Sequence, residues 1–427
     1  MSFHRFLFFT FAKLNFSFIF RMTGSKFISN RLFSLSKEHL SSTVMRLAVT
    51  SVALAIAVML ISLAVVVGFK NQIRAKVIGF VAPIHIQALD RNESYEEEPF
   101  KMDERLLGVL NNTEGIRHYQ CVADKAGMIK TDDEIQGVVM KGVDATYDWS
   151  YFEGSLLDGV VPHYADSVRS EEVLLSKAIA DRMLLTVGDA VRVWFIDEDM
   201  QARGRKFTVK GIYETGLTEF DERYVFCDLN QIRKLNRWEP NETGAVEVWT
   251  DPDDMDKVNE KLYYSIPATL ASYTVRESNP QIFDWLDLLD TNVWLILVLM
   301  FLVAGITMIS MMLIIIIEKT STIGLLKAMG ATNRFVRRVF LHRSLRILLV
   351  GMLIGNLVGI GFCLIQYYTG FIHLNPETYY LSSVPVELHL ITVLLVNGAA
   401  LALWMLMLLI PTSIINRIRP SKAIRFE

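Results

Sequence analysis

The chain has 427 residues, of which 52% are apolar and 21% are charged, and its mean hydropathy is +0.31. This hydropathy argues against an ordinary soluble enzyme, because the apolar excess must be gathered into segments that leave a polar remainder for water. The totals of 43 basic and 46 acidic residues give a net charge of −3, which would argue against a nucleic-acid-binding protein if the charges were evenly distributed. They are not, as shown below, and we expect no nucleic-acid partner.

Residues 1–46 form a basic N-terminal segment that we place in the cytoplasm. Residues 6–20 are apolar and aromatic like a short signal region, but Arg21 follows them and no small-residue cleavage site does. Two alternatives stay open for residues 1–21: an interfacial anchor, or a translation start at Met22. Residues 25–40 mix apolar and basic side chains, which predicts an amphipathic helix on the inner membrane surface.

Four windows have the length of a membrane-spanning helix: 47–69, 293–317, 347–368 and 388–410. A bilayer core takes roughly 20 apolar residues in helical form. Within the four windows the only Asp, Glu, Lys, Arg or His is His389, at the edge of the last one. Backbone amides in hydrocarbon must pair within their own segment, so we predict four transmembrane helices in a 1+3 arrangement.

Basic residues are concentrated on one side of these helices. Segments 1–46, 318–346 and 411–427 together hold 18 Lys and Arg against 3 Asp and Glu. Positively charged loops stay in the cytoplasm. We therefore place these three segments inside, and the large segment 70–292 and the short loop 369–387 outside.

Residues 70–292 have an ordinary globular composition and predict an α+β domain. Apolar residues at alternate positions in 84–88, 191–195, 207–209 and 246–248 predict half-buried strands, with neighbours such as Glu247 on the other face. Ser176 is expected to cap a helix over 177–185, and Asp251 to cap one that contains Met255. Segments 91–102 and 238–244 are predicted to be surface loops. A disulfide between Cys121 and Cys227 stays an open question.

Patterns that carry catalysis are absent from the sequence. It contains no phosphate-binding GxxxxGK[ST], no HExxH and no GxSxG, and its acidic clusters lack the spacing of a calcium-binding loop. The windows also lack carboxylates and lysines, so an ion relay built on such groups has no candidate residues. We expect no catalytic residue, no metal and no cofactor bound by this chain.

Small, polar and sulfur-containing residues predict how the helices pack. Gly351, Gly355 and Gly359 recur every four residues and mark a face where another helix can come close, most simply within the same chain. Asn356 and Asn397 are expected to bond between helices or to a nearby carbonyl. The residues that could line an adaptable cavity for acyl chains, with core packing or a lipid-facing surface as the alternative, are Met300, Met308, Met311 and Met312.

The loop after the second window carries a recognisable pattern. It begins Glu318-Lys-Thr-Ser-Thr-Ile-Gly-Leu-Leu-Lys-Ala-Met-Gly-Ala-Thr332 and predicts a short helix whose ridge, Ile323, Leu326 and Met329, could enter a partner's groove. This pattern resembles the corresponding segment of FtsX/MacB-type ABC transporter permeases. The tail Arg419-Pro-Ser-Lys-Ala-Ile-Arg-Phe-Glu427 is similar to the closing motif of the same family.

Other segments resemble the lipoprotein-releasing permeases of the LolC/LolE type within that family. They are 58–73 followed by 79–86, the stretch Gly211-Ile-Tyr-Glu-Thr-Gly-Leu217, and Trp285-Leu-Asp-Leu-Leu289 before the second helix. The resemblance covers about residues 27–427. It implies that segment 70–292 is a periplasmic domain of MacB type inserted between helices 1 and 2.

The resemblance also implies a mechanism and partners. Such a permease would pair with a second permease subunit and with a separate LolD-like ATPase, which would bind ATP and Mg. ATP-driven helix movements would be relayed to the periplasmic domains. Lipoproteins would leave the bacterial inner membrane for a LolA-like periplasmic carrier. The helices of the permease would also contact membrane lipids. Neither the cargo nor the choice between a homodimer and a heterodimer follows from the sequence.

The family motif assigns residues to ATPase coupling, with a plain re-entry loop as the alternative. The expected coupling residues are Glu318, Ile323, Gly324, Lys327, Ala328, Gly330 and Ala331. The arginines Arg334, Arg337 and Arg338 are expected to set orientation and to meet anionic headgroups. The competing functions are MacB-like efflux, FtsX-like cell division, and a sensory or scaffolding membrane protein without ATP.

Overall fold

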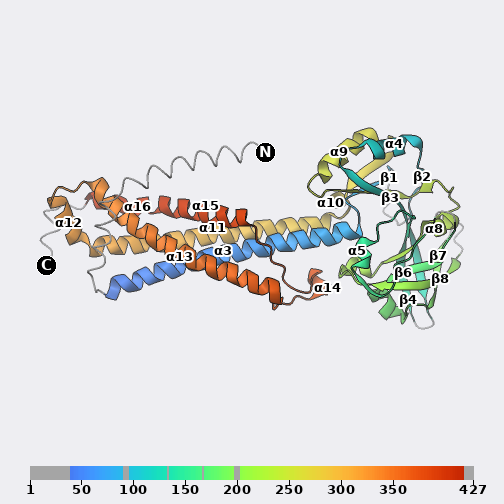
Figure 1. The fold of residues 1–427 in the computed structure, drawn as a ribbon, viewed down its shortest axis with the longest axis horizontal. Helices are drawn as coiled ribbons and strands as arrows, with labels where there is room; N and C mark the ends of the chain where they lie inside the picture. The colour runs from blue at the N-terminus through green and yellow to red at the C-terminus, as the bar shows by residue number, and fades with distance from the viewer. Residues whose placement is uncertain (1–38, 90–95, 132–133, 166–167, 197–201, 418–427) are drawn as a thin grey trace. The chain divides into compact units, whose positions relative to one another are not determined.

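The computed structural model describes residues 39–89, 96–131, 134–165, 168–196 and 202–417, and its elements are labelled as in Figure 1. The chain divides into two compact units. The helical unit takes the described residues of 1–69, 288–371 and 385–427, and the exterior unit takes those of 70–287 and 372–384. The closing motif at 419–427 lies outside the described residues, and so does the amphipathic helix predicted at 25–40 except for residues 39 and 40, which begin the first described helix.

Four helices in the described part of the chain are long and apolar enough to cross a membrane (Figure 1). They are α3 (His39–Phe80), α11 (Pro280–Glu318), α13 (Asn333–Thr369) and α15 (Leu390–Met407), which α16 (Leu409–Thr412) and the 3-10 helix η1 (Ser413–Arg417) extend. The short helix α12 (Thr320–Ala328) connects α11 to α13. The four predicted helices and the domain inserted after the first of them are therefore confirmed.

The ends of these helices follow from local sequence. α3 continues past the apolar window because polar residues such as Asn71 and Lys76 leave hydrocarbon without stopping a helix, and it ends shortly before Pro83. Thr332 caps α13 by accepting a hydrogen bond from the Phe335 N–H. Gly370 closes α13 in the left-handed conformation, with φ of 58°.

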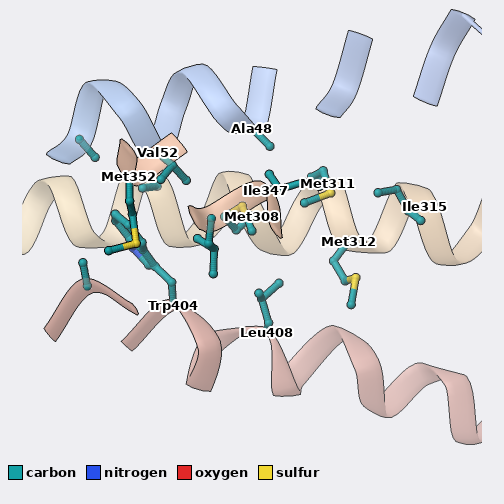
Figure 2. Packing of buried hydrophobic residues seen from close by; sticks show 14 of the residues in the cluster. Ala48, Val52, Met308, Met311, Met312, Ile315, Ile347, Met352, Trp404 and Leu408 are labelled. Carbon is teal, nitrogen blue, oxygen red and sulfur yellow. The ribbon is translucent and has the colours of Figure 1, made fainter. Parts of the chain in front are cut away.

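The core of the helical unit takes side chains from all four long helices. Figure 2 shows Ala48 and Val52 of α3, Met308 of α11, Met352 of α13 and Trp404 of α15 in this cluster. The Trp404 indole N–H donates to a backbone carbonyl of α11, so its one polar group is satisfied at full burial. Large apolar side chains such as Leu357, 70% exposed, cover the outer faces, as expected for helices in lipid.

The exterior unit is built on a mixed sheet that contains ten of its described strands. Their order is β12-β1-β11-β3-β4-β9-β6-β8-β5, with β7 paired to β3 and β8. The pairs β4–β9 and β6–β8 are parallel and the others are antiparallel. The strands are β1 (Ile84–Ala88), β3 (Ile116–Lys130), β4 (Ile135–Val143), β5 (Leu156–Gly159), β6 (Glu172–Ser176), β7 (Ala190–Ile196), β8 (Ala202–Tyr213), β9 (Tyr224–Asp228), β11 (Ala245–Thr250) and β12 (Leu270–Thr274).

Short helices accompany this sheet. They are α4 (Glu104–Asn112), α5 (Ser150–Glu153), α6 (Lys177–Met183), α7 (Thr218–Asp221), α8 (Leu229–Asn236), α9 (Met255–Ser265) and α10 (Val275–Ser278), with α14 (Pro376–Tyr379) in the later segment. The main apolar core of the exterior unit is formed by alternate side chains of β3, β4 and β6 to β9, which pack against α6 and α8. The predicted α+β domain is thereby confirmed.

Three local predictions need correction. Asp251 does not cap α9: the chain turns at 251–254, where the Asp254 N–H bonds to the Asp251 carbonyl, and the helix starts only at Met255. The segments predicted as loops contribute the strands β2 (Phe100–Lys101) and β10 (Glu242–Thr243), which pair with each other. Ser176 caps α6 as predicted, by accepting from the Ile179 N–H.

Glu247 is the third correction. It alternates with Val246 and Val248 on β11, but it is only 1% exposed rather than solvated. The alternation defines two faces of the strand, and here both are covered. The cysteines Cys121, Cys227 and Cys363 are all free thiols in this structure.

Candidate functional site

The loop between α11 and α13 holds the residues assigned to ATPase coupling. Ile323 is fully buried in the core of the helical unit and Gly324 is buried beside it. The Lys327 ammonium donates to the Ile415 carbonyl at 2.6 Å, which ties α12 to η1. These three residues therefore hold α12 on its own subunit.

The exposed face of α12 is formed by other residues. Leu325 and Met329, one helical turn apart, are 54% and 69% exposed, and Ala328 and Gly330 are exposed beside them. Of the predicted ridge, Ile323 is buried and Leu326 is half-buried against the core, so only Met329 faces outward. The loop thus offers a partner an apolar pair that starts at Leu325, a residue that the sequence motif did not single out.

Charged residues and a backbone turn frame this apolar pair. Glu318 ends α11 and pairs with Lys319 at 3.1 Å. Gly330 has φ of 92°, a conformation that favours glycine, and the chain turns there into α13. Ala331 packs against the core, while Arg334 and Arg338 are exposed and Arg337 is half-buried.

The three spaced glycines of α13 lie against α3. A Cβ placed on Gly355 would lie 2.6 Å from the Ala53 carbonyl oxygen, and one on Gly351 would lie 2.7 Å from the Val52 side chain. At Gly359 the nearest atom would be the Ala57 Cα at 3.2 Å. The glycine face therefore makes a close contact between α13 and α3 within one chain, as small residues allow in membrane helices.

Asn356 and Asn397 connect α13 to α15. Each side-chain NH₂ donates to the carbonyl oxygen of the other side chain, at 2.7 and 2.8 Å, and each also donates to a backbone carbonyl of its own helix. The prediction that these amides bond between helices is confirmed. The pair fixes the register of the two helices, because a shift of either would leave amides unpaired at membrane depth.

The methionines considered for a cavity are packed in the core. Met308 and Met311 are 0% and 2% exposed within the four-helix cluster (Figure 2), and Met300 is half-buried against it. Their surroundings are apolar side chains of the same chain. A cavity for acyl chains at Met308 and Met311 would require the helices to separate.

The end of α3 is built into the exterior unit. Phe80, the last helical residue, is 1% exposed. Its ring contacts five aromatic rings, with centroid distances from 4.9 to 6.4 Å; they belong to Phe152, Tyr213, Phe220, Tyr224 and Phe226. Edge and tilted contacts of this kind stabilise beyond simple burial of area. The helix terminus is therefore held on several sides.

A buried ion pair lies beside Phe80. The Lys141 ammonium of β4 lies 2.5 Å from the Glu247 carboxylate and 3.4 Å from the Phe80 carbonyl. Burial alone would raise the pKa of Glu247, but Lys141, His85 and the hydrogen bond from Gln120 together hold that pKa below its usual range. A cation at the carboxyl end of a helix also interacts favourably with the helix dipole. Lys141 thus links β4, β11 and α3.

A second pair of acids lines a cavity of about 600 Å³ next to this ion pair. The Glu97 carboxylate accepts from the Asp124 N–H at 3.0 Å and lies against Gly244, where a Cβ would overlap it. Burial and the neighbouring Asp124 raise the pKa of Glu97 to about 8, and burial raises that of Asp124 to about 6. Near neutral pH this pair therefore holds a proton.

The described residues contain no group of three or more His, Cys, Asp or Glu side chains placed to hold a metal ion. The arrangement suits mechanical contact: an exposed apolar pair on α12, closely packed helices, and a helix end fixed in a folded domain.

The sequence patterns did not identify three residues of this arrangement, which are Phe80, Lys141 and Leu325. The signal for Lys141 was present as a lone charge in the apolar strand 138–143.

In comparisons with known proteins, two different family models match the two main parts of the chain. Residues 46–262 match the model of the MacB-like periplasmic core domain, and residues 294–420 match the FtsX-like permease C-terminal model. Over 405 residues the chain is 22% identical to the lipoprotein-releasing system transmembrane protein LolC of Neisseria meningitidis, covering 90% of this chain and 95% of that protein. The LolE protein of Haemophilus influenzae is 21% identical, with 91% and 95% covered.

Among solved structures, the periplasmic region of MacB from Actinobacillus actinomycetemcomitans is similar to part of the chain. The match has a TM-score of 0.31 and 12% identity, and it covers 47% of this chain and 91% of that one.

Proposed function

The chain belongs to the FtsX/MacB-like family of ABC permeases, and from this premise we propose that it extracts lipoproteins from the bacterial inner membrane for transfer to a periplasmic carrier. A separate ATPase would supply the energy, since the sequence has no phosphate-binding loop of its own. The observation that carries the proposal is the exposed apolar pair of α12, on a loop that the distribution of basic residues places in the cytoplasm.

Relatives support the choice of lipoprotein release within the family. LolC and LolE proteins match over nine tenths of this chain and of their own length. The match to the FtsX-like permease model over 294–420 disfavours a sensory or scaffolding protein that works without ATP. MacB-like efflux and FtsX-like cell division are the competing outcomes of the experiment below.

The proposed mechanism transmits movement along helices. The ATPase would bind the face of α12 that carries Leu325 and Met329, while Ile323, Gly324 and Lys327 fix α12 to its subunit. Closure of the ATPase on ATP and Mg would then move α11 and α13. Because the glycine face of α13 packs directly on α3, α3 would follow, and its end at Phe80 is fixed in the exterior unit.

The other partners follow from the same proposal. A second permease subunit would face this one across the exposed apolar surfaces of the helices, and lipids would cover the remainder. Lipoprotein acyl chains would enter between helices, and a LolA-like carrier would receive the released protein. ATP and Mg would bind to the LolD-like ATPase and not to this chain.

The proposal is tested at the α12 surface. We expect the double variant Leu325→Glu, Met329→Glu to lose the ATPase in pull-downs from membranes and to stop ATP-dependent lipoprotein release, because two charges would be buried in an apolar contact. Leu157→Glu, at a site 55% exposed in the exterior unit, is the matched control and should retain both. Gly324→Trp would be less informative, because Gly324 is buried in the subunit itself.

Two results would count against the proposal. Unchanged recovery of the ATPase with the double variant would remove α12 as its docking surface. Depletion of the protein without accumulation of lipoproteins in the inner membrane would favour efflux or cell division instead.

A further inference from the structure

We propose that Lys76 is a positioning residue that clamps the 372–384 segment onto the exterior unit, so that the connection between α13 and α15 moves together with that unit. The inference rests on the proposed function, because it concerns how helix movement is delivered. It assigns a role to a loop that hydropathy alone marks as a simple connection.

The 372–384 segment is a folded element of the exterior unit. It groups with residues 70–287, although α13 and α15 on either side of it group with the helical unit. Three contacts close it on itself: the Val384 N–H bonds to the Ile372 carbonyl, the Leu374 N–H bonds to the Ser382 carbonyl, and a β-bridge joins His373 to Ser383. The segment can therefore be held as one piece.

Lys76 joins this segment to two other parts of the unit. Its ammonium donates to the Tyr380 carbonyl at 2.9 Å and to the Thr215 carbonyl at 2.5 Å. The Lys76 backbone belongs to α3, Thr215 follows β8, and Tyr380 follows α14. Three segments far apart in the sequence thus meet at the ammonium of Lys76, a half-buried residue.

The acceptor at Thr215 is itself held in place. The Asp221 side chain, 5% exposed, accepts hydrogen bonds from the Thr215 N–H and hydroxyl and from the Gly216 N–H, at 2.7 to 3.1 Å. Gly216 has φ of 75°, and a Cβ there would lie 3.0 Å from the Lys76 ammonium. The turn is shaped to let the ammonium approach, and the Asp221 carboxylate favours a cation beside it.

Tyr380 presents its carbonyl through an unusual backbone. It has φ of 59°, a conformation uncommon for residues other than glycine. Its N–H caps α14 by bonding to the Pro376 carbonyl. A donor that reaches both carbonyls must be long and able to give more than one hydrogen bond, and both bonds are charge-assisted only when the donor is lysine or arginine.

Hydrogen exchange of the full-length protein in lipid nanodiscs tests the clamp. In Lys76→Met, which keeps length but removes the donors, we expect amides of 372–384 to exchange at least about tenfold faster, because two charge-assisted bonds are lost. The sheet amides of β4 and β9 should keep their rates. Lys76→Arg should restore slow exchange. Lys70→Met, on the same helix at a lysine paired with Asp287, is the control and should leave the loop unchanged.

A second measurement asks whether the clamp carries movement. In membranes that contain the partner ATPase, Lys76→Met should keep ATP turnover while lipoprotein release per ATP falls about tenfold, a loss of about 1.4 kcal/mol in coupling. Lys76→Arg should recover most of the release. A purely structural role would not alter this ratio without altering the exchange of the sheet.

The outcomes separate the inference from the proposed function. Unchanged exchange of 372–384 in Lys76→Met, or faster exchange throughout the sheet, overturns the clamp. Faster loop exchange with unchanged release per ATP overturns its role in coupling. If the wild-type protein releases no lipoprotein, the proposed function fails, and the exchange experiment still decides whether Lys76 holds the loop.

Discussion

Glu97 makes the stability of the exterior unit depend on pH. Its pKa is raised from 4.5 to about 8, chiefly by burial and then by Asp124. An acid with a higher pKa in the folded state binds more protons when folded, so stability falls as pH rises from 4.5 towards 8. We expect a slope of at most about 1.4 kcal/mol per pH unit from this group.

Glu97→Gln should remove most of that slope, because the amide resembles the protonated acid and can still accept from the Asp124 N–H. The measurement is the opening free energy of amides around Asp124, from hydrogen exchange corrected for intrinsic rates between pH 5 and pH 8. Glu98→Gln, at an exposed neighbour, is the control and should behave as wild type. An equal slope in Glu97→Gln and wild type would contradict the assignment.

At the scale of elements, the contact between α3 and α13 limits side-chain size. Gly355→Ala should destabilise the protein by about 1–3 kcal/mol, because the new methyl meets the Ala53 carbonyl and that backbone cannot turn aside. Gly361→Ala in the same helix should be tolerated, since a Cβ there meets nothing within 4 Å. Thermal unfolding midpoints of the full-length protein in one detergent compare the two, and equal midpoints would argue against the close contact.

Sequence patterns predicted where the helices and strands lie better than they predicted what packs against each of them. The spacing of Gly351, Gly355 and Gly359 identified a close-packing face, but only the structure shows that α3 occupies it. The period of two on β11 placed Glu247 opposite Val246, yet it could not reveal that Glu247 is buried there and bonded to Lys141 and Gln120. On α12, the motif singled out Ile323, whose burial depends on side chains from distant helices. Periodicity describes a single segment, whereas burial depends on the whole fold.

At the scale of the molecule, hydropathy was sufficient to predict four long apolar helices and a domain inserted after the first. Three of the apolar windows lie within long helices and the fourth, 388–410, covers α15 and part of α16, because a backbone in hydrocarbon has few alternatives to a helix. The same reasoning missed that 372–384 belongs to the exterior unit, since so short a segment carries no periodic pattern that would reveal what it packs against.

The distribution of basic residues makes a prediction about sidedness. In intact spheroplasts, we expect a membrane-impermeant maleimide to label Ile135→Cys but to label Arg334→Cys only after lysis; both sites are exposed. The wild-type chain is the control. Cys227 and Cys363 are buried, and burial with Asp144 raises the pKa of Cys121 to about 12, so little reactive thiolate forms. Labelling of both variants from outside would contradict the four-helix topology.

The assignment of 372–384 to the exterior unit also bears on biosynthesis. A ribosome makes most of that unit early, but it makes Tyr380 only after α11 and α13 have been translated. The Lys76 ammonium can therefore bond to the Tyr380 carbonyl only after that late part of the chain has been synthesised. Nascent chains that stop before residue 372 carry an incomplete unit, so its completion marks the stage at which the third helix has been threaded into the bilayer.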